Sequence, residues 1–312
     1  MPGKSRERVF GRKGIILKRT IASNTDRLFD IINTILLIVI TFLVVYPMYF
    51  IVISSISNPD AVNEGKVVFF PVGISFAGYE KIFQDGRIWL GYRNTIFYTL
   101  AGTTLNVLFT LMAGYSLSRK DLYGKNIIMG FFVFTMYFNG GLIPTYLIVK
   151  SLGLINTPFV MIILGAVGVW NIIITRTFYQ STLSPELLEA AFLDGCTNQS
   201  FFFRIVLPLS SSIIAVLVLF YGVNHWNQYI NALMYLSSRN LYPLQIILKD
   251  ILIASEMTEQ IDVDIHSIGT RERYAELVKY GLIIVASVPV LTVYPFLQRY
   301  FVKGIMIGAL KG

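Results

Sequence analysis

The sequence predicts an all-α membrane protein with six transmembrane helices and a short polar helix between the fourth and the fifth. Of its 312 residues, 54% are hydrophobic and 14% are charged, whereas soluble domains carry about 25% charged residues. Six runs of 19 or more residues contain no Asp, Glu, Lys or Arg, and about 20 apolar residues cross a bilayer as a helix. Buried helices of a soluble protein would give runs of only about 10–14 residues.

The uncharged runs define the expected spans. The first begins at residue 31; it is too long for a signal peptide and lacks a small-residue cleavage site, so we expect it to be retained. Pro47 is expected to kink it. Residues 31–312 would then form one transmembrane domain after a basic cytoplasmic segment, residues 1–30. The six spans are expected at about residues 32–54, 95–117, 126–148, 158–175, 209–230 and 277–298.

The distribution of charge predicts the orientation of these spans. With the N-terminus in the cytoplasm, the inner segments carry 16 of the 26 Lys and Arg and 7 of the 18 Asp and Glu. Their net charge is then +9 and that of the outer segments is −1, as the positive-inside rule requires. We therefore expect both termini in the cytoplasm. The basic stretch Lys4–Arg27 is part of this topology signal, so nucleic-acid binding is not needed to explain it.

Several kinds of chemistry lack support in the sequence. No G-x-x-x-x-G-K-[ST] motif occurs, so the chain should not bind ATP through a P-loop. His225 and His266 are too far apart for the usual metal sites, and His225 is expected to be buried and hydrogen-bonded instead. The single cysteine, Cys196, excludes an internal disulfide. We therefore expect no catalytic residues, no metal and no cofactor bound by this chain.

The third span is interrupted by "FNGGLIP". Asn139, Gly140, Gly141 and Pro144 cannot all continue a regular helix, so the backbone should break near the outer face. Broken helix at membrane depth is tolerated where it lines a cavity, which makes Asn139 and Gly140 candidates for a translocation path. An ordinary loop at the membrane boundary fits these residues equally well.

The polar segment at about residues 184–208 has the features of two short helices at the inner membrane surface. Ser184 can cap the first helix, and Pro185 suits its first position. Gly195 can end that helix in the left-handed conformation. The second is expected at about 198–205.

The first of these helices carries the small pair Ala190 and Ala191 next to the acidic residues Glu189 and Asp194. Small residues permit the close approach of another backbone, and exposed acids can pair with arginine or lysine. A docking surface and a plain amphipathic linker are both compatible with this pattern.

The spacing E-A-A, three residues, G, nine residues, I, one residue, L-P resembles the coupling-loop signature of permease subunits of bacterial ABC importers. The chain matches every fixed position: Glu189, Ala190, Ala191, Gly195, Ile205, Leu207 and Pro208. "WNQYINAL" (Trp226–Leu233) is similar to a segment of maltose-type carbohydrate importers, and "QRYFVKGIMIGALKG" (Gln298–Gly312) to the C-terminus of their second, shorter permease. The outer insert at about 255–273 matches least.

The resemblance implies a permease in a bacterial plasma membrane, with both termini cytoplasmic. Its expected partners are a second homologous permease, two ATPase subunits that bind ATP and Mg²⁺, membrane lipid, and an extracytoplasmic sugar-binding protein (a lipoprotein in a Gram-positive host). The loop, Asp194 included, would form the coupling helix that sits in a groove of the ATPase. Long outer loops favour an oligosaccharide as substrate.

Other functions remain as alternatives to sugar import. A non-sugar solute would fit the same permease architecture. A secondary transporter would favour charged groups inside its spans, and the six uncharged runs leave little room for them. A membrane-embedded enzyme would need a catalytic cluster, which the sequence lacks outside its loops.

The outer end of the fifth span carries polar and aromatic residues. Asn224, Asn227 (or Gln228) and Asn231 are three or four residues apart and are expected on one helical face, which would border an aqueous cavity. The aromatic residues of this segment, among them Trp226 and Tyr229, could stack on a sugar ring or belong to an interfacial belt. The candidates for the translocation path in this region are Asn224, Trp226, Asn227, Tyr229 and Asn231.

Overall fold

The computed structural model describes residues 24–260 and 278–296, which contain helices and no β-strand. The expected all-α fold is thus confirmed for this part of the chain. The C-terminal motif at 298–312, most of the basic N-terminal segment and most of the outer insert lie outside the described residues. The chain divides into two compact units, residues 1–50 and 51–312, which we describe separately.

Helix α1 begins in the first unit and ends just inside the second. It covers Asn24–Ser55 and includes the whole predicted span 32–54. Pro47 lies inside the helix and does not end it. Large apolar side chains along α1 are exposed, among them Leu36 and Phe42. A helix that is apolar all round is typical of a membrane span, because lipid can cover every face.

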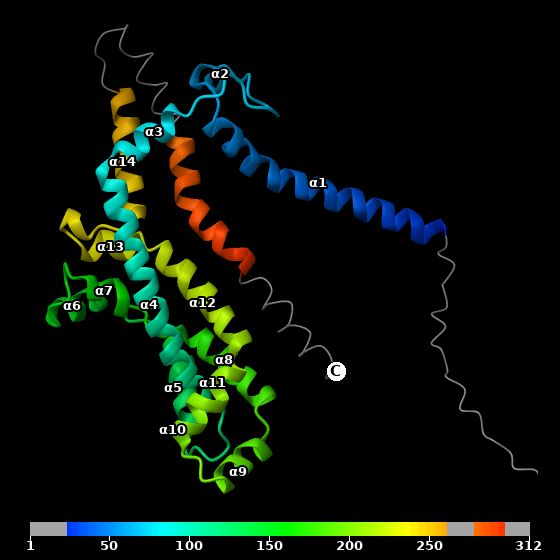
Figure 1. Ribbon diagram of the computed structural model, residues 1–312, viewed down its shortest axis with the longest axis vertical. Helices are drawn as coiled ribbons and strands as arrows, with labels where there is room; N and C mark the ends of the chain where they lie inside the picture. Colours follow the sequence, from blue (N-terminus) through cyan, green and yellow to red (C-terminus); the bar gives the residue numbers. More distant parts are fainter. Residues whose placement is uncertain (1–23, 261–277, 297–312) are drawn as a thin grey trace, which may run out of the picture. The chain divides into compact units, whose positions relative to one another are not determined.

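Helix α4 is the central helix of the second unit, with α3 and α14 near one end and α9 and α10 near the other (Figure 1). It covers Gly86–Ser118 and starts nine residues before the predicted span. The early start follows from Asp85, whose Oδ1 accepts a hydrogen bond from the backbone N–H of Arg87 at 2.9 Å. Helices α3 (Ala77–Gln84) and α14 (Leu244–Gln260) contact α4, and the short helix α2 (Pro59–Asn63) precedes α3 in the chain.

Two glycines of α4 let its neighbours pack closely. A Cβ on Gly102 would lie 2.3 Å from the imidazole of His225 in α12 (Ser211–Trp226). A Cβ on Gly114 would lie 2.6 Å from Thr175 Cγ2 in α8 (Val169–Thr182). Small residues at helix contacts allow backbones to approach, and this closeness is a common source of stability for helices in membranes.

The predicted break in the third span is confirmed. Helix α5, Lys125–Tyr137, and helix α6, Leu142–Ser151, are separated by four residues and bent by 113°. Gly141 has a φ of 86°, a value that favours glycine. Pro144 lies in the first turn of α6, where a proline needs no N–H partner.

The fourth span was predicted as one helix over 158–175, and this prediction is wrong. The structure has α7 over Pro158–Ile163 and α8, with no helix between them. Gly165 in this gap has a φ of 74°, and the N–H of Gly168 donates to the hydroxyl of Tyr221 at 3.0 Å. The regular hydrogen-bond ladder of an α-helix is interrupted here for two reasons. Gly165 has a left-handed backbone, and the N–H of Gly168 bonds to a side chain of another helix.

The fifth span was predicted over 209–230, but the helix α12 ends at Trp226. It is preceded by α10 (Asn198–Phe201), a π-helical segment (Phe202–Val206) and α11 (Leu207–Leu209), and this stretch meets α12 at a bend of 79°. Helix α13, Ile230–Tyr235, follows after a break.

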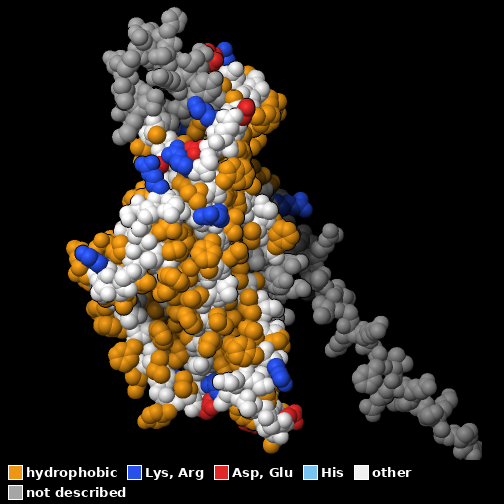
Figure 2. Space-filling view, turned by 60° about the vertical axis from the view of Figure 1, so that its left-hand side comes forward, with side chains coloured by type: hydrophobic (Ala, Val, Ile, Leu, Met, Phe, Trp, Pro, Cys, Tyr) orange, Lys and Arg blue, Asp and Glu red, His pale blue; other side chains and the backbone are white. Residues whose placement is uncertain are grey.

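By length and composition, three described helices could each cross a membrane: α1 from Arg27, α4, and the helix Val278–Phe296. The number rises to five if each of the two bent pairs is one span. Helix α14 packs on α4 through buried residues such as Leu244 and Ile247. On the face shown in Figure 2, apolar side chains form a broad central band, and most charged side chains lie towards its two ends.

Candidate functional site

Helix α9, Pro185–Leu193, starts as its sequence predicts. The hydroxyl of Ser184 accepts a hydrogen bond from the backbone N–H of Leu187 at 3.4 Å, and Pro185 is the first helical residue. The Glu186 carboxylate accepts hydrogen bonds from its own backbone N–H and from Ser184, which lower the pKa of Glu186. An anionic group at this position also favours the positive end of the helix dipole.

The other end of α9 is a Schellman motif. The N–H of Gly195 donates to the carbonyl of Phe192 at 3.0 Å, and the N–H of Cys196 donates to the carbonyl of Ala191 at 2.9 Å. Gly195 has the predicted left-handed conformation, with a φ of 78°. Apart from Gly195 and its two chain neighbours, no atom of the described residues lies within 4 Å of the Cβ that a side chain at Gly195 would add. This position is therefore open towards whatever covers α9.

The two faces of α9 differ. Glu189, Ala190 and Asp194 are exposed, whereas Ala191 is only 7% exposed and packs in a hydrophobic cluster. The structure thus separates the predicted small pair, with one alanine on each face. Leu193 is 89% exposed at the helix end. Sequence analysis missed it, although its spacing of four residues from Glu189 places both on one helical face.

The buried face of α9 belongs to a cluster that joins it to the membrane helices. Phe201, Phe202 and Val206 are buried there against Tyr115 of α4 and Tyr179 of α8. Of the other predicted coupling residues, Ile205 and Leu207 pack against the same cluster, whereas Pro208 is exposed in α11. Ile205 and Leu207 therefore anchor the segment and contribute little to its surface.

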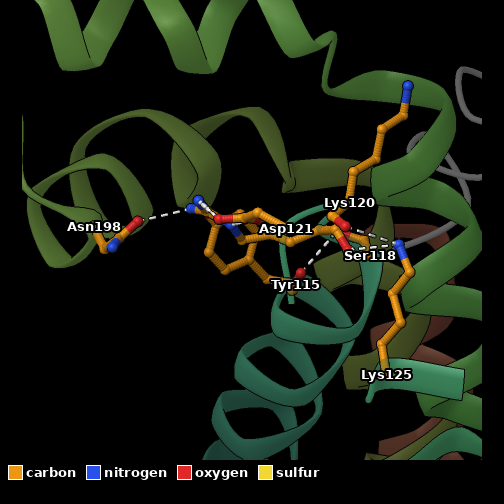
Figure 3. A network of polar contacts seen from close by, with 7 residues as sticks. Tyr115, Ser118, Lys120, Asp121, Lys125 and Asn198 are labelled. Carbon is orange, nitrogen blue, oxygen red and sulfur yellow. Dashed lines mark hydrogen bonds and ion pairs between the residues drawn. The ribbon is translucent and has the colours of Figure 1, made fainter. Parts of the chain in front are cut away.

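Arg119, the residue that follows α4, makes a second connection to this segment. Figure 3 shows the surrounding polar network, in which Tyr115, Asp121 and Asn198 lie close together. Its Nη1 donates to the hydroxyl of Tyr115 at 3.0 Å and to Oδ1 of Asn198 at 2.7 Å. Its Nε and Nη2 donate to the carboxylate of Asp121 at 2.7 and 2.5 Å. These hydrogen bonds raise the pKa of Arg119 and lower the pKa of Asp121. The sequence predicted no role for Arg119.

The predicted face of the fifth span is not continuous. Asn227 caps the end of α12, whereas Asn231 lies in α13 beyond a break. Asn224 and Asn227 are exposed, and Asn231 and Tyr229 are half-buried. The Asn227 amide donates to the carbonyl of Val223 at 2.9 Å. The expectation that these amides share one helical face is therefore wrong.

Trp226 and His225 are packing residues of α12. Trp226 is 7% exposed, and its Nε1 donates to the carbonyl of Ala286 at 3.0 Å. His225 is buried as predicted, with its ring nitrogens 3.0 Å from the side-chain amides of Asn106 and Gln228. The facing atoms are the amide nitrogens Asn106 Nδ2 and Gln228 Nε2. A neutral imidazole accepts at only one ring nitrogen, so it accepts from one of these amides, and the other amide must turn its oxygen to the ring N–H.

Asn139 and Gly140 are exposed between α5 and α6. Oδ1 of Asn139 accepts from the N–H of Gly141 at 2.9 Å, so this side chain stabilises its own turn. Elsewhere, a cavity of about 730 Å³ lies between α4, α12 and the helix Val278–Phe296, and its wall is almost entirely apolar. Trp226 is the single predicted path residue that lines it. Within residues 24–260 and 278–296, no group of His, Cys, Asp or Glu could hold a metal.

Comparison with known proteins identifies the family, although no protein-family model matches the chain. The polygalacturonan/rhamnogalacturonan transport system permease protein YtcP of Bacillus subtilis (strain 168) is 37% identical over 288 residues, which cover 92% of this chain and 99% of that protein. The arabinooligosaccharides transport system permease protein AraQ of Halalkalibacterium halodurans is 27% identical over 278 residues, 88% of this chain and 93% of that protein.

A solved structure is also similar: a bacterial ABC transporter involved in the import of the acidic polysaccharide alginate. The TM-score is 0.81 with 32% identity, and the match covers 89% of this chain and 98% of the solved one. Both the sequence relatives and the solved structure are thus matched over most of their length. The chain therefore belongs to the permease subunits of bacterial ABC sugar importers, and it is a transporter subunit rather than an enzyme.

Proposed function

We propose that this permease imports an oligosaccharide and that residues 184–208 are the surface on which an ATPase subunit docks. The observation that carries the proposal is the two-faced helix α9. One face exposes Glu189, Ala190 and Leu193, and the other is buried in the cluster that includes Tyr115 and Tyr179. Leu193, 89% exposed beside acids, offers an apolar side chain that a docked partner could bury. A surface anchored to two membrane helices could pass a displacement to them.

The docking surface is testable through Leu193. We expect Leu193→Ser to reduce co-purification of the ATPase and sugar uptake by roughly tenfold, because loss of a buried apolar anchor costs at least about 1.4 kcal/mol. Leu152→Ser is the matched control: Leu152 is 65% exposed and also precedes a left-handed glycine, Gly153, at a helix end. Equal results for the two variants would mean that α9 is only an amphipathic linker.

The proposed subunit is one half of a permease pair, and it has the character of the second, shorter half. Two ATPase subunits with ATP and Mg²⁺ would drive transport, and an extracytoplasmic binding protein would deliver the sugar. Six spans with both termini in the cytoplasm agree with the positive-inside rule, and the segment that contains α7 and α8 would be the fourth span. Purification of the complex and mass spectrometry of its subunits would test the composition.

The topology has a separate test in single-cysteine variants of a Cys196→Ser chain. Tyr123, in the loop after α4, is 98% exposed, and Phe70, before α3, is 77% exposed. We expect a membrane-impermeant thiol reagent to label Phe70→Cys in intact cells and Tyr123→Cys only after the membrane is opened. Labelling of both positions in intact cells would contradict the six-span topology.

The substrate class follows from the relatives. The name of YtcP specifies polygalacturonan and rhamnogalacturonan, and the solved relative takes part in the import of an acidic polysaccharide. Galacturonate units carry carboxylates, so we infer that acidic oligosaccharides are favoured over neutral ones. Competition of labelled uptake by oligogalacturonate and by neutral arabinooligosaccharide would rank the two classes. Stronger competition by the neutral sugar would reverse this inference.

The translocation path is proposed to pass the turn between α12 and α13, with Asn139 and Gly140 on a further segment of its wall. Asn224, Asn227, Tyr229 and Asn231 have accessible polar groups that a hydrated sugar could use. Trp226 would act by packing. Asn227→Leu and Asn231→Leu should slow uptake without loss of assembly, compared with Asn240→Leu, which changes an exposed amide in a neighbouring turn. Wild-type rates in both would exclude this turn from the path.

A further inference from the structure

Arg119 occupies a position that neither the coupling-loop signature nor the path accounts for. It follows the last residue of α4, and its side chain is only 13% exposed although it is charged. A buried guanidinium needs partners for most of its donors. The partners come from three places: α4, the loop after it, and α10.

The contacts of Arg119 orient it between these elements. Asp121 receives two hydrogen bonds from the guanidinium, at 2.7 and 2.5 Å, and neutralises its charge. Lys125 Nζ donates to the backbone carbonyl of Arg119 at 2.9 Å, which ties together the two ends of the loop between α4 and α5. The remaining donor group, Nη1, is thereby directed to Tyr115 and Asn198. A planar, bidentate arginine sets direction in a way that apolar packing does not.

The Arg119–Asn198 contact joins residues that are 79 positions apart. Along the chain, α10 is connected to α12 through a π-helical segment and a bend of 79° at Ser210. Such irregular segments are usual sites of bending in helices. The guanidinium, which also lies 5.7 Å from the ring centre of Phe192 in α9, gives the segment a direct connection to α4 that avoids this joint.

We propose that Arg119 is a positioning residue that makes α4 move together with the α9–α10 segment during transport. The proposal rests on the proposed docking of an ATPase at α9, and it adds the route by which a displacement of α9 reaches the central membrane helix. In this role Arg119 acts through Asn198 and α10 and needs no contact with nucleotide or sugar. Its role is to keep the docking segment and α4 in one orientation.

The test compares Arg119→Met with Arg87→Met in the assembled transporter. Arg87 pairs with Asp85 at the other end of the same helix, again two residues away. We expect Arg119→Met to keep the ATPase subunits bound and basal ATP hydrolysis active. Uptake, and the stimulation of hydrolysis by the loaded binding protein, should fall roughly tenfold, because the variant loses the charged hydrogen bonds of a mostly buried guanidinium to Tyr115 and Asn198. Arg87→Met should stay within about twofold, as for an exposed pair.

A second variant protects the test against misfolding. Asn198→Ala removes only the bond between the two elements and should reproduce most of the uncoupling. The double variant Arg119→Met/Asn198→Ala should be no worse than Arg119→Met alone, because the two residues act through one contact. Arg119→Lys should recover part of the stimulation, since lysine keeps the charge without the planar donors.

The outcomes separate this proposal from the docking proposal. Normal stimulation and uptake in both Arg119→Met and Asn198→Ala, or strictly additive losses in the double variant, would overturn the positioning role. Docking at α9 would still stand if Leu193→Ser released the ATPase. Retention of the ATPase by Leu193→Ser would instead remove the docking premise.

Discussion

The two ends of α4 carry the same kind of ion pair but use it differently. At the N-terminal end, Arg87 Nη2 lies 2.6 Å from Asp85 Oδ2, and its Nε lies 3.0 Å from both carboxylate oxygens. Asp85 also caps the helix, so this pair defines where α4 begins. At the C-terminal end, Arg119 pairs with Asp121 and in addition reaches Asn198 of α10.

The difference between the ends lies in the burial of the arginine. The side chain of Arg87 is 55% exposed and that of Arg119 is 13% exposed, whereas their partners differ the other way, with Asp85 at 25% and Asp121 at 62%. An exposed pair contributes under about 1 kcal/mol, because water and salt screen it. A guanidinium taken out of water must satisfy its donors, so it restricts the elements that supply the acceptors. Two similar sequence patterns, R-x-D and D-x-R, therefore have different structural consequences.

Among substitutions that compare the two ends of α4, Gly195→Asp is expected to cause the largest loss of uptake. Gly195 and Gly65 both follow a helix in the left-handed conformation, with φ of 78° and 68°, and both have open space where a Cβ would lie. The backbone strain of a side chain is about 1 kcal/mol at either position. Only Gly195→Asp adds bulk and charge to the proposed ATPase interface, so it should abolish uptake, whereas Gly65→Asp should not.

Uptake and ATPase stimulation in nanodiscs, with a melting curve for each variant, would check this prediction. Equal loss of uptake in both glycine variants would show that backbone strain, and not docking, explains the requirement at Gly195.

Glu189→Ala should have the next largest effect. If Glu189 pairs with a basic group of the ATPase in a desolvated interface, its removal costs about 2–5 kcal/mol, or at least roughly tenfold in association. Glu80→Ala is the counterpart near the other end of α4, where Glu80 accepts from Gln84 at 3.4 Å on an exposed surface. Titration of ATPase binding would distinguish the two. A change under about 1 kcal/mol for Glu189→Ala would place it at an exposed rim.

Tyr115→Phe is expected to have a moderate effect. The change removes the hydroxyl that accepts from Arg119 and keeps the ring against Phe202, at 5.3 Å between centres. Loss of one hydrogen bond costs about 0.5–1.5 kcal/mol. Trp89→Phe, which removes a bond from Nε1 to the carbonyl of Phe83 at the other end of α4, is the control. The stimulation ratio should fall in Tyr115→Phe and remain unchanged in Trp89→Phe, even if both lose similar thermal stability.

The smallest effect is expected on stability when the pH is lowered. Hydrogen bonds from Arg87 and Arg119 lower the pKa values of Asp85 and Asp121. A lowered pKa in the folded state stabilises the protein above the unfolded value of about 3.9, and this stabilisation is lost as pH falls through the folded pKa. Solvent screening keeps each contribution under about 1 kcal/mol.

Unfolding in detergent at pH 5 and pH 3 would test this expectation. Asp85→Asn and Asp121→Asn should each lose less stability between these two pH values than the parent chain does. An unchanged pH dependence in both variants would assign acid sensitivity to other carboxylates.

The local sequence was sufficient for features that depend on adjacent residues. Ser184 and Pro185 predicted the start of α9, and Gly195 predicted its end, because a cap or a left-handed turn needs only its own residues and their backbone. The break before α6 follows in the same way from the two glycines at 140 and 141. The uncharged runs indicated membrane spans because the lipid requirement is a matter of composition and length.

The tertiary structure decided the features that depend on distant partners. Ala190 and Ala191 are identical in type, and only the cluster around Tyr115 determines that one is buried. The division of the fourth span is coupled to Tyr221, which binds the backbone at Gly168 from another helix. The contact of Arg119 with Asn198 crosses 79 residues. A sequence pattern records which residues can be buried or paired, but the partner is chosen when the helices pack, because burial and hydrogen bonding depend on neighbours in space.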